Sequence, residues 1–396
     1  MNYLTNVWKL YVIRFFQSLI PAYVIERLFW EERGITVQEV VYTEVIFAVT
    51  IVLLEIPSGI VADKWGGRKN MILLSSVLEA IMFFLLINST EFWHFAIAIF
   101  LSGIAGSANS GAENALLYDS LLLSKKEKSF EKYLGRVNSF DLISAILAAL
   151  SGSFLANKFD FEVNYWLSVI SMLVSACVAV MLVEPITKNQ STEHQTIMGN
   201  LKISIHFFMK NTNVCLVVLA GIAIGAALNF VWEFWQLYLN RLDISIHFFG
   251  FFLAALMLLT IPGNLLAHAV IKRYKYRSVL ITITAIITVG FIFISIKSGY
   301  TGLTAMCIIV LASGFVEPIV SGYLHHRIDS CTRATIDSFQ SLGLNAMLIL
   351  VGLGFGYFSS YYDVFGGGYA FIALISGVFL VYFLFASKEI IDEQVN

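Results

Sequence analysis

The fold of this chain is decided by the stretch Glu55-Ile-Pro-Ser-Gly-Ile-Val-Ala-Asp-Lys-Trp-Gly-Gly-Arg-Lys69. A long apolar run ends in this stretch, and another apolar run begins directly after it. Between the two runs lie an acid, two adjacent glycines and three basic residues, which suit a tight, hydrated turn. Basic residues in a short loop also mark the cytoplasmic side of a membrane. The stretch therefore predicts a tight cytoplasmic turn between two transmembrane helices.

The composition excludes a soluble globular protein. Of the 396 residues, 58% are hydrophobic and only 13% are charged, far from the average of soluble domains. Runs of about twenty apolar residues, each long enough to cross the bilayer as a helix, recur through the whole chain. The four cysteines show no paired spacing, so neither a disulfide framework nor a metal site is expected. We therefore expect an all-α polytopic membrane protein without a cofactor or a metal.

The apolar runs predict twelve transmembrane helices, in two sets of six. The predicted ranges are 9–30, 40–62, 70–90, 93–122, 137–157, 163–183, 214–240, 246–269, 278–297, 302–324, 335–359 and 367–387. If the N-terminus lies inside, nineteen Lys and Arg residues fall in cytoplasmic segments, five fall outside and one, Arg14, lies within a span. This asymmetry predicts that both termini are cytoplasmic.

The two sets of helices predict two similar half-domains, residues 1–183 and 214–396, joined by a cytoplasmic linker at 184–213. Ile56-Pro-Ser-Gly59 at the end of helix 2 returns as Ile261-Pro-Gly263 at the end of helix 8, and Ser110-Gly111 in helix 4 returns as Ser321-Gly322 in helix 10. Within the linker, apolar residues at helical spacing predict an amphipathic helix on the inner membrane surface.

The opening stretch resembles the signature of the major facilitator superfamily of transporters, G-x-x-x-D-[RK]-x-G-[RK]-[RK], which lies between their second and third helices. The matching positions are Gly59, Asp63, Lys64, Gly66, Arg68 and Lys69. Gly67 is an extra residue, so the basic pair comes one position late. The resemblance implies the twelve-helix fold of that family. It also implies a gate, in which Asp63 approaches the start of helix 11 near 335–338, and Arg68, with Lys64, meets Asp119.

Ionisable residues within the spans are the candidates for transport chemistry, because a charge inside the membrane is costly. Arg14, Glu55 and Glu113 each lie roughly 8–12 Å from the cytoplasmic ends of their helices, counted at the helical rise. In the resembled fold helices 1 and 4 are neighbours, which implies contact between Arg14 and Glu113. We predict a buried proton-coupling cluster; the alternative is that Arg14 reaches lipid phosphates and Glu113 bonds to a backbone or hydroxyl group. Glu79, near the middle of helix 3, is expected to form a packing hydrogen bond.

The candidates for the substrate cavity lie on helices 7 and 10. They are Asn229, Glu233, Trp235, Tyr238 and Glu317. Pro318 can kink helix 10 beside Glu317, although a purely structural kink is equally possible. Trp235 and Tyr238 can form an aromatic surface for a cation, or they can serve as anchors at the membrane interface. With one acid on each cavity helix of the resembled fold, and few amide or basic side chains, we expect cationic or neutral lipophilic substrates.

The leading prediction is a plasma-membrane transporter that exports small molecules in exchange for protons and acts as a monomer. The residues 110–121 and 55–59 also resemble a bacterial drug-efflux branch of the superfamily, although helix 5 lacks the Gly-Pro repeat of many drug/proton antiporters. The alternatives are an uptake symporter for a small solute, an exporter of a lipid or siderophore, and a receptor or scaffold. No catalytic constellation or nucleic-acid-binding pattern supports an enzyme or a nucleic-acid partner. Proton movement in energised vesicles would distinguish these classes.

Overall fold

The computed structural model describes residues 3–62, 67–185, 207–297, 299–325 and 333–385, and every regular element in them is helical. The chain groups into two compact units. Unit 1 comprises 1–36, 46–194 and 244–254, and unit 2 comprises 37–45, 195–243 and 255–396. The predicted half-domain boundaries differ from these units by the two short segments 37–45 and 244–254. Most of the predicted linker and its amphipathic helix lie outside the described residues.

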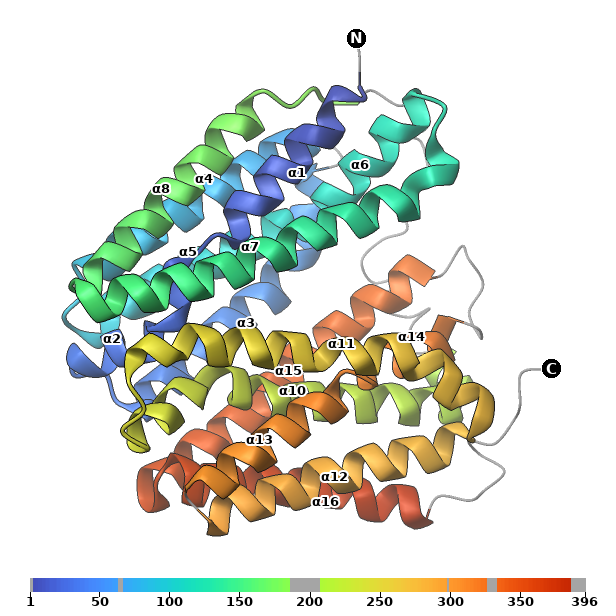
Figure 1. Cartoon of the computed structure of the whole chain (residues 1–396). Coiled ribbons are helices and arrows are strands. Elements are labelled where there is room, and N and C mark those ends of the chain that lie inside the picture. Colours follow the sequence, from blue (N-terminus) through green and yellow to red (C-terminus); the bar gives the residue numbers. More distant parts are fainter. Residues whose placement is uncertain (1–2, 63–66, 186–206, 298, 326–332, 386–396) are drawn as a thin grey trace. The chain divides into compact units, whose positions relative to one another are not determined.

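Among the described residues up to 185, the chain forms ten helical elements, which Figure 1 shows in their arrangement. They are α1 (Thr5–Ser18), η1 (Pro21–Val24), α2 (Glu26–Glu32), α3 (Val37–Val61), α4 (Arg68–Ile87), α5 (Phe92–Asn109), α6 (Ala112–Leu123), η3 (Glu127–Ser129), α7 (Phe130–Lys158) and α8 (Glu162–Val180). Within unit 1, α4 packs between α5 and α8, and α1 packs against α7 and α8. Leu10, Ile13, Ile72, Leu116 and Leu121 belong to the apolar core where these helices meet.

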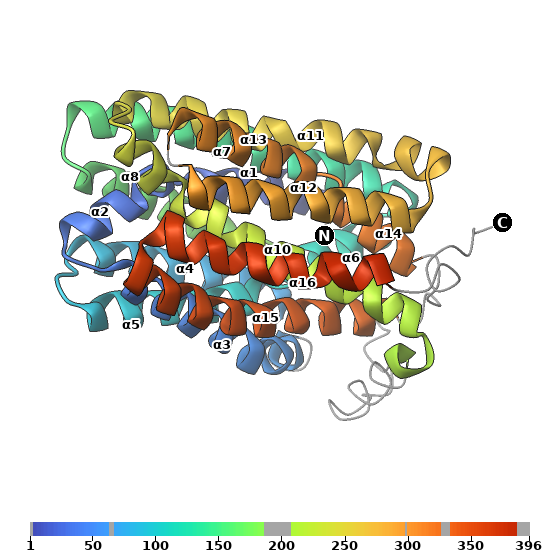
Figure 2. The ribbon, with the colours of Figure 1, turned by 90° about the horizontal axis from the view of Figure 1, so that it is seen from below.

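The described residues from 207 onward form nine further elements, seen from another side in Figure 2. They are α10 (Thr212–Arg241), η4 (Ile246–Phe248), α11 (Phe249–Arg273), α12 (Tyr276–Ile296), α13 (Tyr300–Ser313), α14 (Val316–His325), α15 (Arg333–Tyr362), η5 (Val364–Gly368) and α16 (Tyr369–Phe385). Within unit 2, α12 packs against α13 and α16, while α10 packs against α14 and α15. Stacked rings of Phe230, Phe234 and Phe355 fill the contact between α10 and α15.

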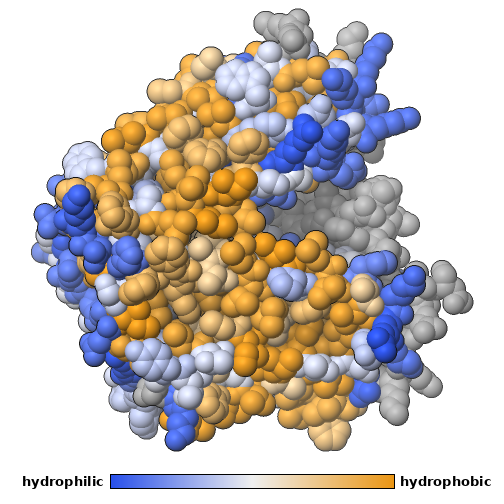
Figure 3. All heavy atoms as spheres, viewed as in Figure 1, coloured by the Kyte–Doolittle hydropathy of each residue, from blue (hydrophilic) through white to orange (hydrophobic). Residues whose placement is uncertain are grey.

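The helical surface suits a lipid bilayer. Eleven segments of the described chain are long and apolar enough to cross a membrane. On the face shown in Figure 3, hydrophobic residues cover the middle of the helices and hydrophilic residues gather at their ends. This pattern confirms the expected all-α polytopic membrane protein. The remaining predicted span, helix 1, is built from α1, η1 and α2, none of which is long enough alone.

Helix 1 is interrupted rather than continuous because Pro21 begins a short 3-10 turn after α1 ends. Polar side chains of α8 satisfy the backbone exposed at this break. The Asn164 amide donates to the carbonyl of Pro21 (3.2 Å), and the Ala22 N–H donates to the hydroxyl of Ser168 (3.2 Å). Such partners are needed inside a membrane, where no bulk water satisfies the backbone.

Helices 4 and 10 are also broken, each at a Ser-Gly pair. Helix 4 breaks at Ser110-Gly111, where Gly111 has a φ of 73°, and helix 10 breaks directly after Ser313-Gly314. Gly314 lies against the backbone of Thr260, so no larger residue fits there. The internal repeat of Ser110-Gly111 is therefore Ser313-Gly314, and the predicted counterpart, Ser321-Gly322, lies within α14. The kink predicted at Pro318 belongs to this break, since the proline lies in the first turn of α14 and cannot donate a hydrogen bond to the carbonyl of Gly314, four residues earlier.

Candidate functional site

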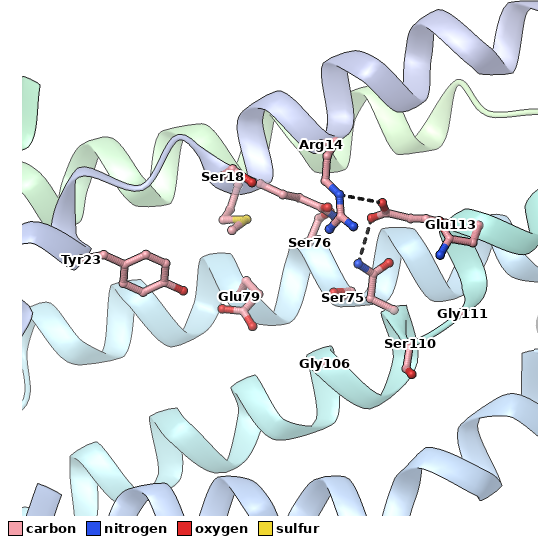
Figure 4. Close-up of a pocket in the computed structure, with 14 residues that line it drawn as sticks. Arg14, Ser18, Tyr23, Ser75, Ser76, Glu79, Gly106, Ser110, Gly111 and Glu113 are labelled. Carbon is pink, nitrogen blue, oxygen red and sulfur yellow. Dashed lines mark hydrogen bonds and ion pairs between the residues drawn. The ribbon is translucent and has the colours of Figure 1, made fainter. Parts of the chain in front are cut away.

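Unit 1 contains a polar cavity of about 440 Å³ at the breaks of helices 1 and 4. Residues of α1, α4, α5, α6 and α8 line it, together with Tyr23 of η1. Figure 4 shows the arrangement, with Arg14 and Glu113 near one end, Tyr23 at the other end and Glu79 between them. The wall is mostly serine, amide and charged side chains, which is unusual for the interior of a membrane bundle.

Arg14 and Glu113 form an ion pair across this cavity. The Arg14 Nε lies 3.5 Å from Glu113 Oε2, and the Asn109 amide donates to Glu113 Oε1 (2.8 Å). The Glu113 side chain is only 8% exposed, whereas that of Arg14 is 32% exposed. Because Glu113 lies in the first turn of α6, directly after the break, the positive end of the helix dipole adds to the stabilisation of its carboxylate.

Asp141 of α7 is a third charged member that sequence reasoning missed. Its Oδ1 lies 3.9 Å from Arg14 Nε and accepts a hydrogen bond from the Ser18 hydroxyl. Arg14 therefore lies between two carboxylates, one buried and one about half exposed. The sequence does contain a signal for Asp141: it lies four residues inside the predicted span 137–157, and a charge within a span is costly.

The structure places the other predicted acids of unit 1 apart from this ion pair. Glu55 accepts a hydrogen bond from Ser110 (3.3 Å) and lies beside the break in helix 4, but it is not part of the cavity wall. Glu79 accepts a hydrogen bond from Ser102 (2.8 Å), which is the packing contact expected for it. Glu79 also lines the cavity, which was not expected.

Two of the substrate-site candidates are packing residues of unit 2. Trp235 and Tyr238 are each only 1% exposed. The Tyr238 hydroxyl donates to the carbonyl of Gly299 (2.9 Å) and accepts from its N–H (3.1 Å), and its ring meets the edge of Phe365. Trp235 and Tyr238 therefore do not form the expected aromatic surface for a cation, because a substrate cannot reach side chains that are enclosed in the bundle.

The remaining candidates of unit 2 are more accessible. Asn229 and Glu233 lie one turn apart on α10, so they share one face of the helix, and both are partly exposed. Glu317 is exposed in the first turn of α14, beside Pro318. All three remain candidates for contact with a substrate.

The predicted gating motif is only partly described. Asp63, Lys64 and Gly66 lie outside the described residues, and Gly59 is exposed near the end of α3. The Arg68 guanidinium forms an ion pair with Asp119 and also donates to the carbonyl of Ala115 (3.1 Å).

An unpredicted residue, Glu184, completes this end of unit 1. Its two carboxylate oxygens accept hydrogen bonds from the backbone N–H groups of Arg68 (2.9 Å) and Lys69 (2.8 Å). Glu184 thus satisfies backbone donors in the first turn of α4, which have no partner within the helix.

Comparison with known proteins identifies the family. The model of the Major Facilitator Superfamily matches residues 8–336. The chain is 24% identical over 195 residues to the multidrug resistance protein MdtG of Citrobacter koseri, covering 46% of this chain and 44% of that protein. It is 25% identical over 222 residues to MdtG of Proteus mirabilis, covering 50% of this chain and 52% of that protein. The chain thus spans about half the length of these curated relatives.

Solved structures resemble the chain over almost its whole length. The nucleoside transporter NupG superposes with a TM-score of 0.79 at 16% identity, covering 98% of this chain and 100% of that chain. A D-xylose-proton symporter superposes with a TM-score of 0.74 at 12% identity, covering 98% of both chains. At such low identity the likeness is evidence for the fold alone.

Proposed function

Because the chain belongs to the Major Facilitator Superfamily and is a membrane transporter rather than an enzyme, we propose that it exports lipophilic cationic or neutral small molecules in exchange for protons. The observation that carries this proposal is the Arg14–Glu113 ion pair at the wall of the polar cavity. A buried carboxylate with one cationic partner can gain or lose a proton as its surroundings alternate between the two faces of the membrane.

The coupling step is a competition for Glu113. While its carboxylate is charged, Arg14 holds it; when a proton from water neutralises it, the ion pair weakens and Arg14 turns toward Asp141, 3.9 Å away. The protein acts as a monomer that spans the plasma membrane, with both termini in the cytoplasm. The gate formed by Asp63, Lys64, Gly66, Arg68 and Asp119 controls access from that side. Two relatives named for multidrug resistance support export as the direction.

Inside-out vesicles containing the protein test this function. With the lumen acidified, adding a lipophilic cation should make the lumen less acidic, because each molecule that enters the lumen releases a proton outward. Glu113→Gln should abolish this response while the protein remains folded, since glutamine keeps the Asn109 contact but cannot carry a proton. Glu162→Gln is the matched control, because Glu162 pairs with Arg33 at another part of unit 1. Uphill transport by Glu113→Gln would remove Glu113 from the mechanism.

A second candidate is an uptake symporter for a polar solute. The sequence led us to expect few amide side chains in the cavity, yet Gln17, Asn109 and Asn114 all line it. Such side chains suit a hydroxyl-bearing substrate. In the same vesicles a symporter would make the lumen more acidic when a sugar or nucleoside is added, which is the opposite sign.

A further inference from the structure

The cavity of unit 1 contains a second acid that the proposed coupling step does not use. Glu79 lies on α4 eleven residues after Arg68, so it is roughly 16 Å along a helix that crosses the membrane. It lines the same cavity as the Arg14–Glu113 pair, but it lies farther from the break in helix 4 and nearer to Tyr23 (Figure 4).

Glu79 has few partners for a charge. Ser102 donates one hydrogen bond to its Oε1 (2.8 Å), while its Oε2 is buried and accepts none. No ion pair joins Glu79 to a Lys, Arg or His in the described parts of the chain. Glu113, in contrast, has the guanidinium of Arg14, the amide of Asn109 and a helix N-terminus.

The elements around Glu79 add no positive charge at its carboxyl group. Glu26 of α2 contributes a further negative charge, and its own cation, Arg27, lies 3.9 Å from it. From α8, Tyr165 faces this region, and its hydroxyl accepts a hydrogen bond from Trp30. The only ionisable residue of α5 is His94, which lies in its first turn, more than two turns before Ser102.

A carboxylate in this position is unfavourable. A buried charge that lacks a cation and has one neutral donor is costly, and a group in such a site takes up a proton instead. From this geometry we infer that Glu79 is a second proton-binding site of the transporter, occupied while the cavity is empty and separate from the Arg14–Glu113 pair. The ligand is a single proton that comes from water in the cavity.

Other polar atoms of the cavity wall are also buried without a hydrogen-bond partner among the described residues. They are the acceptors Gln17 Oε1 and Asn109 Oδ1 and the donor Arg14 Nε, which lies beside Glu113 rather than Glu79. Protonation converts Glu79 Oε2 from an acceptor into a donor. The two acids of one cavity thus have different surroundings: Glu113 has a cation beside it and Glu79 has one neutral donor, as in sites where two carboxyl groups have different roles.

This site changes what a cation meets when it enters the cavity. The proton of Glu79 passes to water, the carboxylate that remains becomes the counter-ion of the bound cation, and the proton returns when the cation leaves. The inference concerns the protonation of the protein at rest, so it holds or fails independently of the direction of transport.

Infrared spectroscopy of the purified protein in lipid nanodiscs tests the inference without a known substrate. At neutral pH the wild-type protein should show the carbonyl stretch of a protonated carboxyl group, shifted in heavy water. Glu79→Gln should lose this band, and it should remain folded because glutamine resembles the neutral acid. Glu113→Gln, the matched control, should keep the band.

Two results would overturn the inference: a wild-type spectrum without such a band at neutral pH, or a band that persists in Glu79→Gln. If Glu79→Gln cannot be purified, Glu79→Asp decides the question. Aspartate keeps the acid and moves it, so the band should shift in frequency; an unchanged band would assign the proton to another residue.

Discussion

The carboxylate of Glu184 accepts hydrogen bonds from the first backbone N–H groups of α4, at Arg68, although 116 residues of chain separate the two positions. The cap therefore joins the segment that follows α8 to the start of α4. It also lies beside Arg68, which pairs with Asp119 of α6. The carboxylate of Glu184 thus holds the first turn of α4, which contains the signature residue Arg68.

Glu184→Ala should lower the free energy of unfolding by about 1–2 kcal/mol, because an N-terminal cap and a charge near the helix dipole are both lost. Thermal unfolding of the detergent-solubilised protein measures this change. Glu131→Ala, which removes an exposed acid from the first turn of α7, should leave the unfolding temperature nearly unchanged. Equal unfolding temperatures for wild type and Glu184→Ala would show that the cap contributes nothing to stability.

Gly67, the extra residue relative to the family signature, has a backbone conformation that favours glycine. It has a φ of 68° and a ψ of 148° at the N-cap of α4, and a Cβ atom there would lie 3.1 Å from the Glu184 carboxyl group. Gly67→Ala should therefore cost about 1–3 kcal/mol in backbone strain alone. Gly135→Ala is the control, since Gly135 lies inside α7 with open space around its Cβ position. If both variants unfold at the same temperature, the glycine conformation is not required.

Asp141→Asn should slow proton-coupled transport several-fold without abolishing it. The substitution leaves the Arg14–Glu113 pair in place but removes the second carboxylate that receives Arg14 when Glu113 is protonated. Initial transport rates in vesicles, compared at equal protein content, give the measurement. Asp160→Asn, in the loop after α7, is the control. A rate equal to that of wild type would place Asp141 outside the coupling step.

Tyr238→Phe and Glu233→Gln should separate packing from substrate contact on α10. Tyr238→Phe loses the hydroxyl that binds Gly299 and should cost about 1 kcal/mol of stability, with substrate preference unchanged.

Glu233→Gln should weaken the transport of cations more than that of neutral compounds, because only the charge is removed. Competition assays with a cationic and a neutral substrate measure this preference. Equal losses for both substrates in Glu233→Gln would give Glu233 a packing role.

Much of the fold could be predicted from the sequence, because hydropathy shows which stretches are apolar and long enough to cross a bilayer as a helix. The breaks within helices could not be predicted. Ser110-Gly111 lies in a run that reads as one helix, and only the φ of Gly111 shows that the run is two helices. In helix 10, Pro318 predicted an interruption, but the sequence did not show that α13 ends completely at Ser313, beside the close contact of Gly314 with Thr260.

The candidate site could be predicted where depth and the family resemblance agree. Counting residues put Arg14 and Glu113 at a similar depth, and the resemblance implied that helices 1 and 4 are neighbours. Glu184 could not be found in this way, because no local pattern links a cap to a helix more than a hundred residues away. The burial of Trp235 and Tyr238 was also hidden, since an apolar face of a membrane helix looks the same whether it meets lipid, protein or substrate.

The interruption between α5 and α6 also has a consequence for water. A helix that stops inside a bilayer leaves its last carbonyls and the first N–H groups of its successor without partners along the chain. At Gly111 these groups lie on a polar cavity rather than against lipid. The first amides of α6 are thus set to exchange their hydrogens with solvent from within the hydrophobic layer, whereas amides in the middle of an unbroken helix are bonded within it.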